Sequence, residues 1–283
     1  MFVFLHLWDV HYDYVPPREY VELFDPGYEG TLDATDLEDN QAIHAGMPAR
    51  DLEHLLALYD GEIRFTDDVL AKILAALERE RLLEGAIVVV TADHGEEFFE
   101  HLGKGHQSTL YDEVVRVPLI ICWPGELPAG RVVADQVRLV DLAPTLLALA
   151  GVAPLPAAQG RDLGPLLRGG ELARAPALLD LTCADFDVVA LRTEAHKVLS
   201  ARAGKLVAGF DLAADPRERT PKGVEHDWVR AGRDELAERL GEARAARARI
   251  GAEAGAPSVD AELEERLRRL GYTGDARGGD AKR

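Results

Sequence analysis

The sequence has few cysteines, fewer basic than acidic residues and no long hydrophobic run, and each of these shortages excludes a class of protein. Only two of its 283 residues are cysteines, Cys122 and Cys183, so neither a disulfide framework nor a cysteine-based zinc cluster is expected. No apolar run approaches the roughly 18 residues that a transmembrane helix needs. The formal net charge of −18 argues against binding to nucleic acid or anionic membranes, which requires clustered Lys and Arg.

The first residues also lack the basic head and small-residue cleavage site of a signal peptide. The chain as written therefore reads as cytoplasmic, although its localisation stays unknown. Phe2-Val3-Phe4-Leu5 is already strand-like directly after Met1, and we expect a buried strand over residues 2–8. A core strand at the very start indicates an N-terminal truncation, an internal start codon or a split gene.

The most informative run covers residues 86–97, where Val88-Val89-Val90-Thr91 is followed by Asp93-His94-Gly95. It is typical of a buried parallel strand that delivers two metal-capable side chains at its carboxyl end, where ligands bind in open α/β sheets. A carboxylate, an imidazole and a glycine in succession suit a divalent cation on a tight turn. The alternative is that Asp93 caps a helix and His94 is incidental.

The periodicity of the chain predicts an α/β fold. Apolar residues recur at helical spacing over residues 51–82 and again over 141–150, whereas 86–91 and 117–122 read as strands. Strands separated by helices indicate a mostly parallel sheet flanked by helices.

The character of the sequence changes after about residue 175. Short strands over residues 188–192 and 196–199 predict a small C-terminal antiparallel sheet, and charged helices are expected over 233–250 and 258–270. The predicted organisation is an α/β core over residues 1–175, a small antiparallel subdomain over 176–232, a helical tail over 233–272 and disorder over 273–283.

Several further segments stand in a fixed order around the Asp93 run. They are Leu5-His6-Leu7-Trp8-Asp9-Val10-His11, Tyr59-Asp60-Gly61-Glu62, Gly103-Lys104-Gly105-His106, Tyr111-Asp112-Glu113, Arg116-Val117-Pro118, Val140-Asp141-Leu142-Ala143-Pro144-Thr145 and Phe210-Asp211-Leu212. Together they resemble the sulfatase family of the alkaline-phosphatase superfamily over most of residues 2–220. The resemblance implies an incomplete alkaline-phosphatase-like fold and a metal-dependent hydrolase of sulfuric esters. Full-length members of the family are often exported.

One part of the family pattern is missing from these residues. Sulfatases carry two further Asp metal ligands and a Cys/Ser-x-Pro/Ala-x-Arg segment, whose Cys or Ser becomes the formylglycine nucleophile. Neither Cys122 nor Cys183 is followed by both the Pro or Ala and the Arg. The chain therefore resembles the C-terminal part of a sulfatase without its formylglycine, and we expect it to be inactive alone.

The resemblance assigns the metal to Asp93 and His94, which match the family's second ligand pair, Asp-Asn in many members. Oxygen-rich coordination favours calcium, whereas an imidazole also suits manganese or zinc.

The resemblance gives catalytic roles to His11, His106 and Lys104. His11 matches the histidine that contacts the sulfate and can protonate the leaving oxygen. Lys104 and His106 compete for one further sulfate contact: spacing from Asp93 supports Lys104, and the register of the following Tyr111 segment supports His106. We prefer His106 and keep Lys104 as a second contact. His101 is expected to be an exposed histidine without a role.

Three functions remain open from the sequence. The first is a sulfatase that acts on a small-molecule or glycan sulfate ester, with a separate N-terminal half as a candidate partner. The second is a phosphoester or phosphonate hydrolase or a phosphotransferase of the same superfamily. The third is a non-catalytic remnant or binding module that keeps half a site.

Overall fold

The computed structural model describes residues 1–106, 108–182, 187–201 and 206–254, which fall into two compact units. Unit 1 contains residues 1–108 and 113–129; unit 2 contains 109–112 and the chain from Gly130 onward. The helix predicted over 258–270, the disorder predicted over 273–283 and Cys183 lie outside the described residues. The domain boundaries predicted at residues 175 and 232 stay predictions.

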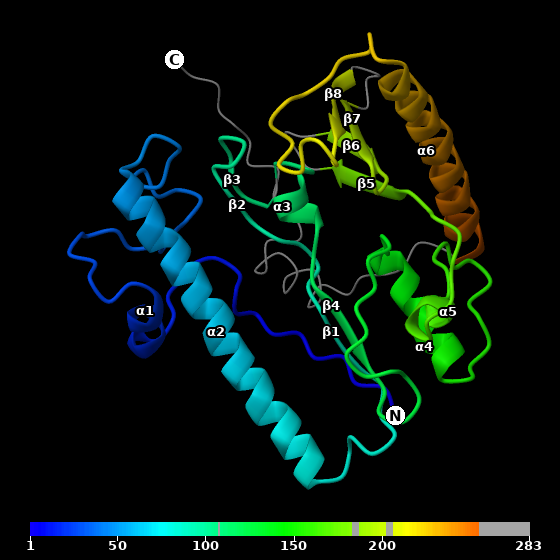
Figure 1. The fold of residues 1–283 in the computed structure, drawn as a ribbon, viewed down its shortest axis with the longest axis horizontal. Helices are drawn as coiled ribbons and strands as arrows, with labels where there is room; N and C mark the ends of the chain where they lie inside the picture. The colour runs from blue at the N-terminus through cyan, green and yellow to red at the C-terminus, as the bar shows by residue number, and fades with distance from the viewer. Residues whose placement is uncertain (107, 183–186, 202–205, 255–283) are drawn as a thin grey trace. The chain divides into compact units, whose positions relative to one another are not determined.

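Helix α2 (Ala49–Arg79) is the long helix of unit 1, and α1 (Arg18–Phe24) packs against it (Figure 1). Pro48 precedes the first residue of α2, and proline near a helix start costs no backbone hydrogen bond. The first half of α2 buries one face, which includes Leu55 and Leu58. The helix predicted over residues 51–82 is confirmed.

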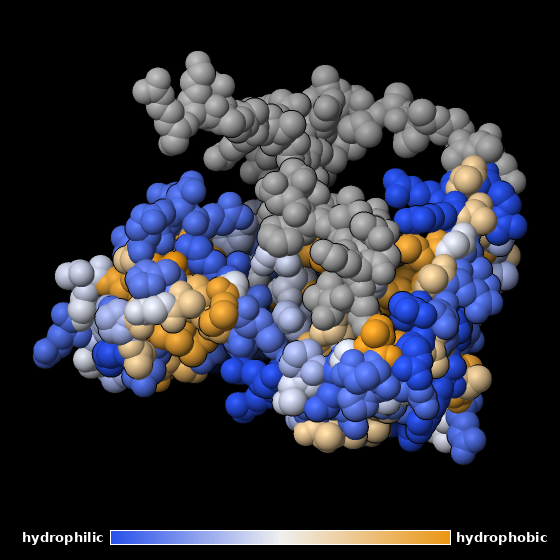
Figure 2. Space-filling model, turned by 90° about the horizontal axis from the view of Figure 1, so that it is seen from above, coloured by the Kyte–Doolittle hydropathy of each residue, from blue (hydrophilic) through white to orange (hydrophobic). Residues whose placement is uncertain are grey.

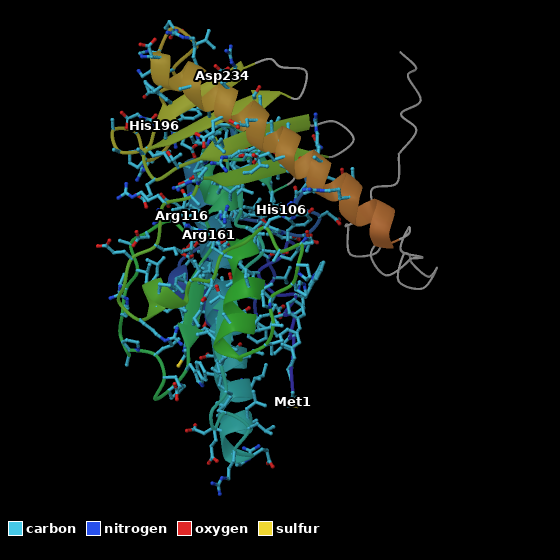
Figure 3. All side chains as sticks on the ribbon, turned by 90° about the vertical axis from the view of Figure 1, so that its right-hand side faces the viewer. Met1, His106, Arg116, Arg161, His196 and Asp234 are labelled. Carbon is cyan, nitrogen blue, oxygen red and sulfur yellow. The ribbon has the colours of Figure 1, made fainter. Side chains whose placement is uncertain are left out.

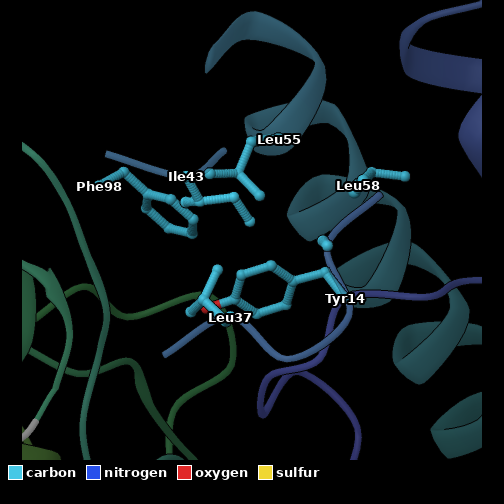
Figure 4. Packing of buried hydrophobic residues seen from close by; sticks show 7 residues of the cluster. Tyr14, Leu37, Ile43, Leu55, Leu58 and Phe98 are labelled. Carbon is cyan, nitrogen blue, oxygen red and sulfur yellow. The ribbon is translucent and has the colours of Figure 1, made fainter. Parts of the chain in front are cut away.

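The hydrophobic core of unit 1 joins this helix face to the loops before it and to strand β2 (Glu97–Phe98) (Figure 4). The buried members of this core are Tyr14, Ala34, Leu37, Ile43, Leu55, Leu58 and Phe98. Four of them come from the loop-rich region before α2, so burial of apolar side chains, rather than regular hydrogen bonding, holds that region in place.

The strands of unit 1 depart from the prediction. Strand β1 (Val88–Thr91) pairs with β4 (Leu119–Cys122), and the two are antiparallel, with Val88 opposite Cys122. The intervening chain forms the antiparallel pair β2 and β3 (Lys104–Gly105) and the short helix α3 (Asp112–Val115). A parallel pair needs a crossover connection, which this excursion does not make. The predicted parallel sheet is not confirmed, since every pairing among the described strands is antiparallel.

The strand predicted over residues 2–8 is wrong. These residues form no strand, and Phe2 and Phe4 are 81% and 78% exposed. An apolar run becomes a strand only when a neighbouring backbone accepts and donates its hydrogen bonds, and no described segment pairs with this one.

On the face drawn in Figure 2, hydrophobic residues lie among a majority of hydrophilic ones.

Unit 2 contains the predicted C-terminal antiparallel sheet, in the order β5 (Ala177–Thr182), β6 (Asp187–Arg192), β7 (His196–Ala201) and β8 (Leu206–Asp211). Helix α6 (Asp227–Ala254) lies along this sheet (Figure 1), and its Leu236 packs against Val189 and Leu191. The unit also holds η1 (Leu139–Asp141), α4 (Leu142–Leu149) and α5 (Gly164–Leu167). No helix in the described ranges combines the length and apolar character needed to cross a bilayer.

A buried charge network lies inside unit 2. Lys197, which is fully buried, contacts Asp112 at 2.6 Å and Glu218 at 2.8 Å. Arg192 contacts the same Asp112 at 2.7 Å, and Lys197 also donates to the carbonyl oxygen of Leu110. Burial would raise the pKa of Asp112, but its two cationic neighbours outweigh burial and lower that pKa to about 2. Two positive and two negative groups thereby neutralise one another.

Candidate functional site

Three loops of unit 1 carry the residues of the candidate site. His11 follows the turn at Asp9-Val10, and Asp93-His94 follow the end of β1 after Ala92. His106 directly follows β3, and Figure 3 labels its place on the ribbon. His11 is far in the sequence from the other two segments, and all three segments belong to the same unit.

The structure brings the three histidine rings together. The rings of His94 and His106 stack with their centroids 3.8 Å apart, and the ring of His11 meets His106 edge-on at 5.2 Å. The ring of Trp8 stacks on that of His11 with centroids 4.4 Å apart, and the ring of Tyr12 lies 5.3 Å from that of His106. The result is a group of imidazoles walled by two aromatic rings, which can present several N–H donors to one anion.

Glycine allows the backbone approach that this group requires. The amide N–H of Gly95 donates to the carbonyl oxygen of Val114 at 2.7 Å, and a Cβ at Gly95 would lie 2.1 Å from the carbonyl oxygen of Glu113. Gly105, between Lys104 and His106, has a φ of +80°, a conformation that glycine adopts without strain.

Asp93 and His94 fit a cation site by the chemistry of their donors. His94 Nδ1 contacts the carbonyl oxygen of Gly95 at 2.9 Å, which is the second contact that a metal-binding histidine commonly makes. Its Nε2 lies 3.7 Å from Oδ1 of Asp93, a gap that one ion could bridge with bonds of about 2.0–2.2 Å. Two donors are an incomplete set, because calcium takes about six to eight oxygen ligands.

Lys104 lies apart from the imidazole group. Its Nζ donates to the carbonyl oxygens of Ile43 at 2.9 Å and of Asn40 at 3.3 Å. Desolvation lowers the pKa of this ammonium, although Asp39 and Glu38 oppose that effect. Lys104 and His106 are therefore near in sequence but contact different groups. The Lys104 ammonium binds carbonyl oxygens of the loop before α2, whereas the His106 ring contacts the rings of His11 and His94.

Sequence reasoning missed the carboxylate that accompanies His106. Glu96 Oε1 lies 3.0 Å from His106 Nδ1, and Glu96 Oε2 accepts a hydrogen bond of 2.6 Å from the hydroxyl of Tyr14. Glu96 directly follows the Asp93-His94-Gly95 motif, so its position next to a candidate site was visible. Its pairing with a histidine ten residues later was not, because the turn between β2 and β3 creates that contact.

Tyr12 is a second residue that sequence reasoning missed. Its hydroxyl donates to Glu38 at 2.6 Å, which ties the aromatic wall of the site to the loop before α2. Desolvation, followed by the hydrogen bond to Glu38, raises the pKa of Tyr12, so the phenol keeps its proton.

A second cluster in unit 1 corrects the expectation for His101. Its side chain is only 11% exposed, and its Nδ1 lies 2.5 Å from Glu113 Oε1. Donor atoms of Glu97, His101 and Glu113 lie within 4.8 Å of one another, close enough to surround an ion. However, one oxygen of Glu97 already accepts the backbone N–H groups of His101 and Gly103. These hydrogen bonds give the cluster a structural role, because they hold the turn between β2 and β3 in place.

Comparison with known proteins gives two family matches. The Sulfatase family matches residues 1–152, which is more than half of the chain. The family described as N-sulphoglucosamine sulphohydrolase, C-terminal, matches residues 106–245.

Among curated relatives, arylsulfatase K of Mus musculus is 34% identical over 182 residues, covering 60% of this chain and 32% of that protein. Steryl-sulfatase of Mus musculus is 38% identical over 127 residues, covering 39% of this chain and 20% of that protein. The chain thus spans about a third or less of the length of these relatives.

Solved structures agree on the fold. The phosphonate monoester hydrolase of Agrobacterium radiobacter has a TM-score of 0.58 at 28% identity, covering 70% of this chain and 42% of that one. A protein solved with its substrate D-glucosamine-2-N,6-O-disulfate has a TM-score of 0.61 at 20% identity, covering 91% of this chain and 62% of that one.

Proposed function

Because the chain belongs to the sulfatase family, we propose that it supplies the anion-binding and leaving-group side of a metal-dependent hydrolase of sulfuric esters. The observation that carries this proposal is the meeting of His11, His94 and His106 in one unit. Hydrolysis of a sulfate ester places negative charge on the sulfuryl oxygens and on the leaving alcohol. A group of imidazoles beside a cation site suits both needs.

Each histidine has a distinct part in the proposal. His106 donates from Nε2 to a sulfuryl oxygen, because its Nδ1 is engaged by Glu96. His11 lies next to it, and its Nδ1 contacts the carbonyl oxygen of Tyr12, so its Nε2 is the nitrogen that gives a proton to the leaving oxygen. Lys104 contributes through the loop carbonyls that it holds rather than by touching the ester.

Asp93 and His94 are the proposed metal ligands. A divalent cation bound there would hold and polarise the ester oxygens. Calcium is our first choice and manganese or zinc the alternatives, since a carboxylate with an imidazole suits the latter two as well. Further ligands and the nucleophile have to come from residues outside this chain, either in a longer polypeptide or in a separate N-terminal half.

The substrate class follows only from the relatives. Steryl-sulfatase of Mus musculus and N-acetylgalactosamine-6-sulfatase of Canis lupus familiaris are named for a sterol and an amino-sugar sulfate. We therefore propose a small-molecule or glycan sulfate ester for this chain.

A phosphonate or phosphate ester is the second candidate. The solved phosphonate monoester hydrolase is 28% identical to this chain, and a site of imidazoles and a cation also suits a phosphoryl anion. A non-catalytic binding module would retain the anion site without turnover.

The test begins with the purified chain, which we expect to hydrolyse an aryl sulfate no faster than the metal alone. Co-expression with a sulfatase N-terminal segment that carries the nucleophile should produce turnover. In that complex, His106→Ala should lower kcat by roughly 10²-fold or more. Lys104→Ala is the matched comparison and should have a clearly smaller effect.

Two outcomes would overturn the proposal. Robust turnover by the isolated chain that is lost on Asp93→Ala would show that no outside nucleophile is needed. A complex that hydrolyses an aryl phosphonate monoester well and an aryl sulfate poorly would favour the second candidate.

A further inference from the structure

Glu96 is a buried carboxylate held at both of its oxygens. Its side chain is 3% exposed, its Oε1 lies 3.0 Å from His106 Nδ1, and its Oε2 accepts the Tyr14 hydroxyl at 2.6 Å. Tyr14 is 1% exposed and belongs to the hydrophobic core of unit 1. Desolvation, followed by the neighbouring Glu96, raises the pKa of Tyr14, so the phenol remains a donor. The carboxylate is therefore fixed from the side of the core.

This arrangement distinguishes the two nitrogens of the His106 ring. Nδ1 is taken by Glu96, whereas Nε2 has no hydrogen-bond partner among the described residues. The stacked ring of His94 at 3.8 Å also restricts the plane of the His106 ring. A rotation of the ring that exchanged its nitrogens would break the contact with Glu96 and leave a buried carboxylate oxygen without a partner, which is costly.

We propose that Glu96 is a positioning residue, which orients His106 so that Nε2 is the nitrogen presented to the bound ester, with Tyr14 anchoring Glu96 to the core. A carboxylate behind a functional histidine fixes the ring and its tautomer in hydrolases and metal sites of other folds. The inference rests on the proposed function, because it concerns the same anion site.

The pair His101 and Glu113 provides a control within the same unit. There too an imidazole Nδ1 meets a glutamate oxygen, at 2.5 Å, but the ring belongs to the turn between β2 and β3. A general disturbance of unit 1 would alter both pairs. A specific loss of the Glu96 contact would alter His106 only.

The experiment uses the full chain labelled with ¹⁵N at histidine, observed by NMR at one fixed pH. In the wild type, His106 should show a downfield Hδ1 proton protected from solvent exchange. In Glu96→Gln this proton should move upfield and exchange on the order of tenfold faster, since a bond to a charged acceptor is lost. In Tyr14→Phe, which keeps the carboxylate, the change should have the same direction and be smaller. Glu113→Gln should change the His101 signals and leave those of His106 in place.

Titration with inorganic sulfate separates this inference from the proposed function. We expect sulfate to shift Nε2 of His106 more than Nδ1, and its apparent affinity to fall about tenfold in Glu96→Gln. If sulfate shifts no imidazole of the wild type, the proposed anion site is wrong, and the Hδ1 signal alone still decides whether Glu96 orients the ring. Unchanged Hδ1 signals of His106 in both Glu96→Gln and Tyr14→Phe would overturn the inference.

Discussion

The two units of this chain bury charge in opposite ways. In unit 2, Lys197 and Arg192 meet Asp112 and Glu218, so that positive and negative groups are equal in number. In unit 1, the rings of His11 and His94 lie against the ring of His106, whose Nδ1 contacts the buried carboxylate of Glu96. In the network of unit 2, the charged groups pair with one another. In the group of unit 1, Nδ1 of His106 is paired with Glu96, and its Nε2 is left to bind a ligand.

Whether the partners of a buried polar group are all present distinguishes structural from functional groups more clearly than the extent of burial does. Lys197 is more deeply buried than His106, yet its partners account for its charge. A closed network stabilises a fold when it is complete, and removing one member leaves an unpaired buried charge. An open network is where a ligand can complete the hydrogen bonding.

Removing Lys197 should have the largest effect on stability. Lys197→Met leaves Asp112 and Glu218 without their shared cation, and we expect unit 2 to lose about 3–5 kcal/mol. Amide hydrogen exchange of strands β6 and β7 measures this loss. The exposed Arg219→Met is the matched control and should change exchange little. A loss below about 1 kcal/mol would mean that the network behaves like a surface ion pair.

Acid should weaken the same network through Asp112. The pKa of Asp112 is lowered to about 2, so its stabilisation is complete above its usual pKa and is lost as the pH falls toward 2. The amount is roughly 2 kcal/mol. Desolvation raises the pKa of Glu218, which acts in the opposite direction because its protonation relieves burial of charge.

The difference between the wild type and Asp112→Asn isolates that contribution. The two free energies of unfolding should converge between about pH 5 and pH 2. Parallel curves over this range would show that Asp112 keeps no lowered pKa.

Breaking the anchor of the open network should cost less. Tyr14→Phe removes the donor to Glu96 Oε2, and we expect unit 1 to lose about 1.5 kcal/mol. Exchange of amides in α2 reports the change. Tyr59→Phe is the control, because its ring packs on Tyr14 while its hydroxyl makes no hydrogen bond to the described residues. Equal losses in both variants would assign the effect to packing.

The smallest effect is expected at the open edge of the imidazole group. His11→Ala removes a ring that contacts Trp8 and His106 but forms no ion pair with the described residues, so stability should change by less than about 0.5 kcal/mol. His6→Ala, at an exposed position nearby, is the comparison in thermal unfolding. A loss above about 2 kcal/mol would give His11 a structural role.

The sequence predicted the parts of this chain that depend on local patterns. The helical spacing of residues 51–82 predicted α2, and the short strands after residue 175 predicted the C-terminal sheet. It failed where the outcome depends on a partner: residues 2–8 form no strand, and β1 pairs with β4 in the antiparallel sense. An apolar run indicates that a segment can be buried, but it does not indicate which segment will pair with it.

The candidate site followed the same rule. Motif order singled out His11, Asp93, His94 and His106, and in the structure the rings of the three histidines are in contact. The sequence could not decide whether Lys104 or His106 contacts the anion, because two residues this close in sequence can point their side chains at different parts of the fold. Nor could it find Glu96, since its pairing exists only once β2 and β3 have folded together.

The order in which segments of the chain alternate between the two units limits how the units can be separated into fragments. Residues 109–112 belong to unit 2, while the chain on both sides of them belongs to unit 1. A polypeptide that begins at residue 130 would thus lack Leu110 and Asp112, and with them two of the groups that contact Lys197. No single proteolytic cut can separate the units, because the backbone passes between them three times. Excision of the C-terminal sheet as an independent module should yield a weakened fold unless the short peptide 109–112 is returned to it.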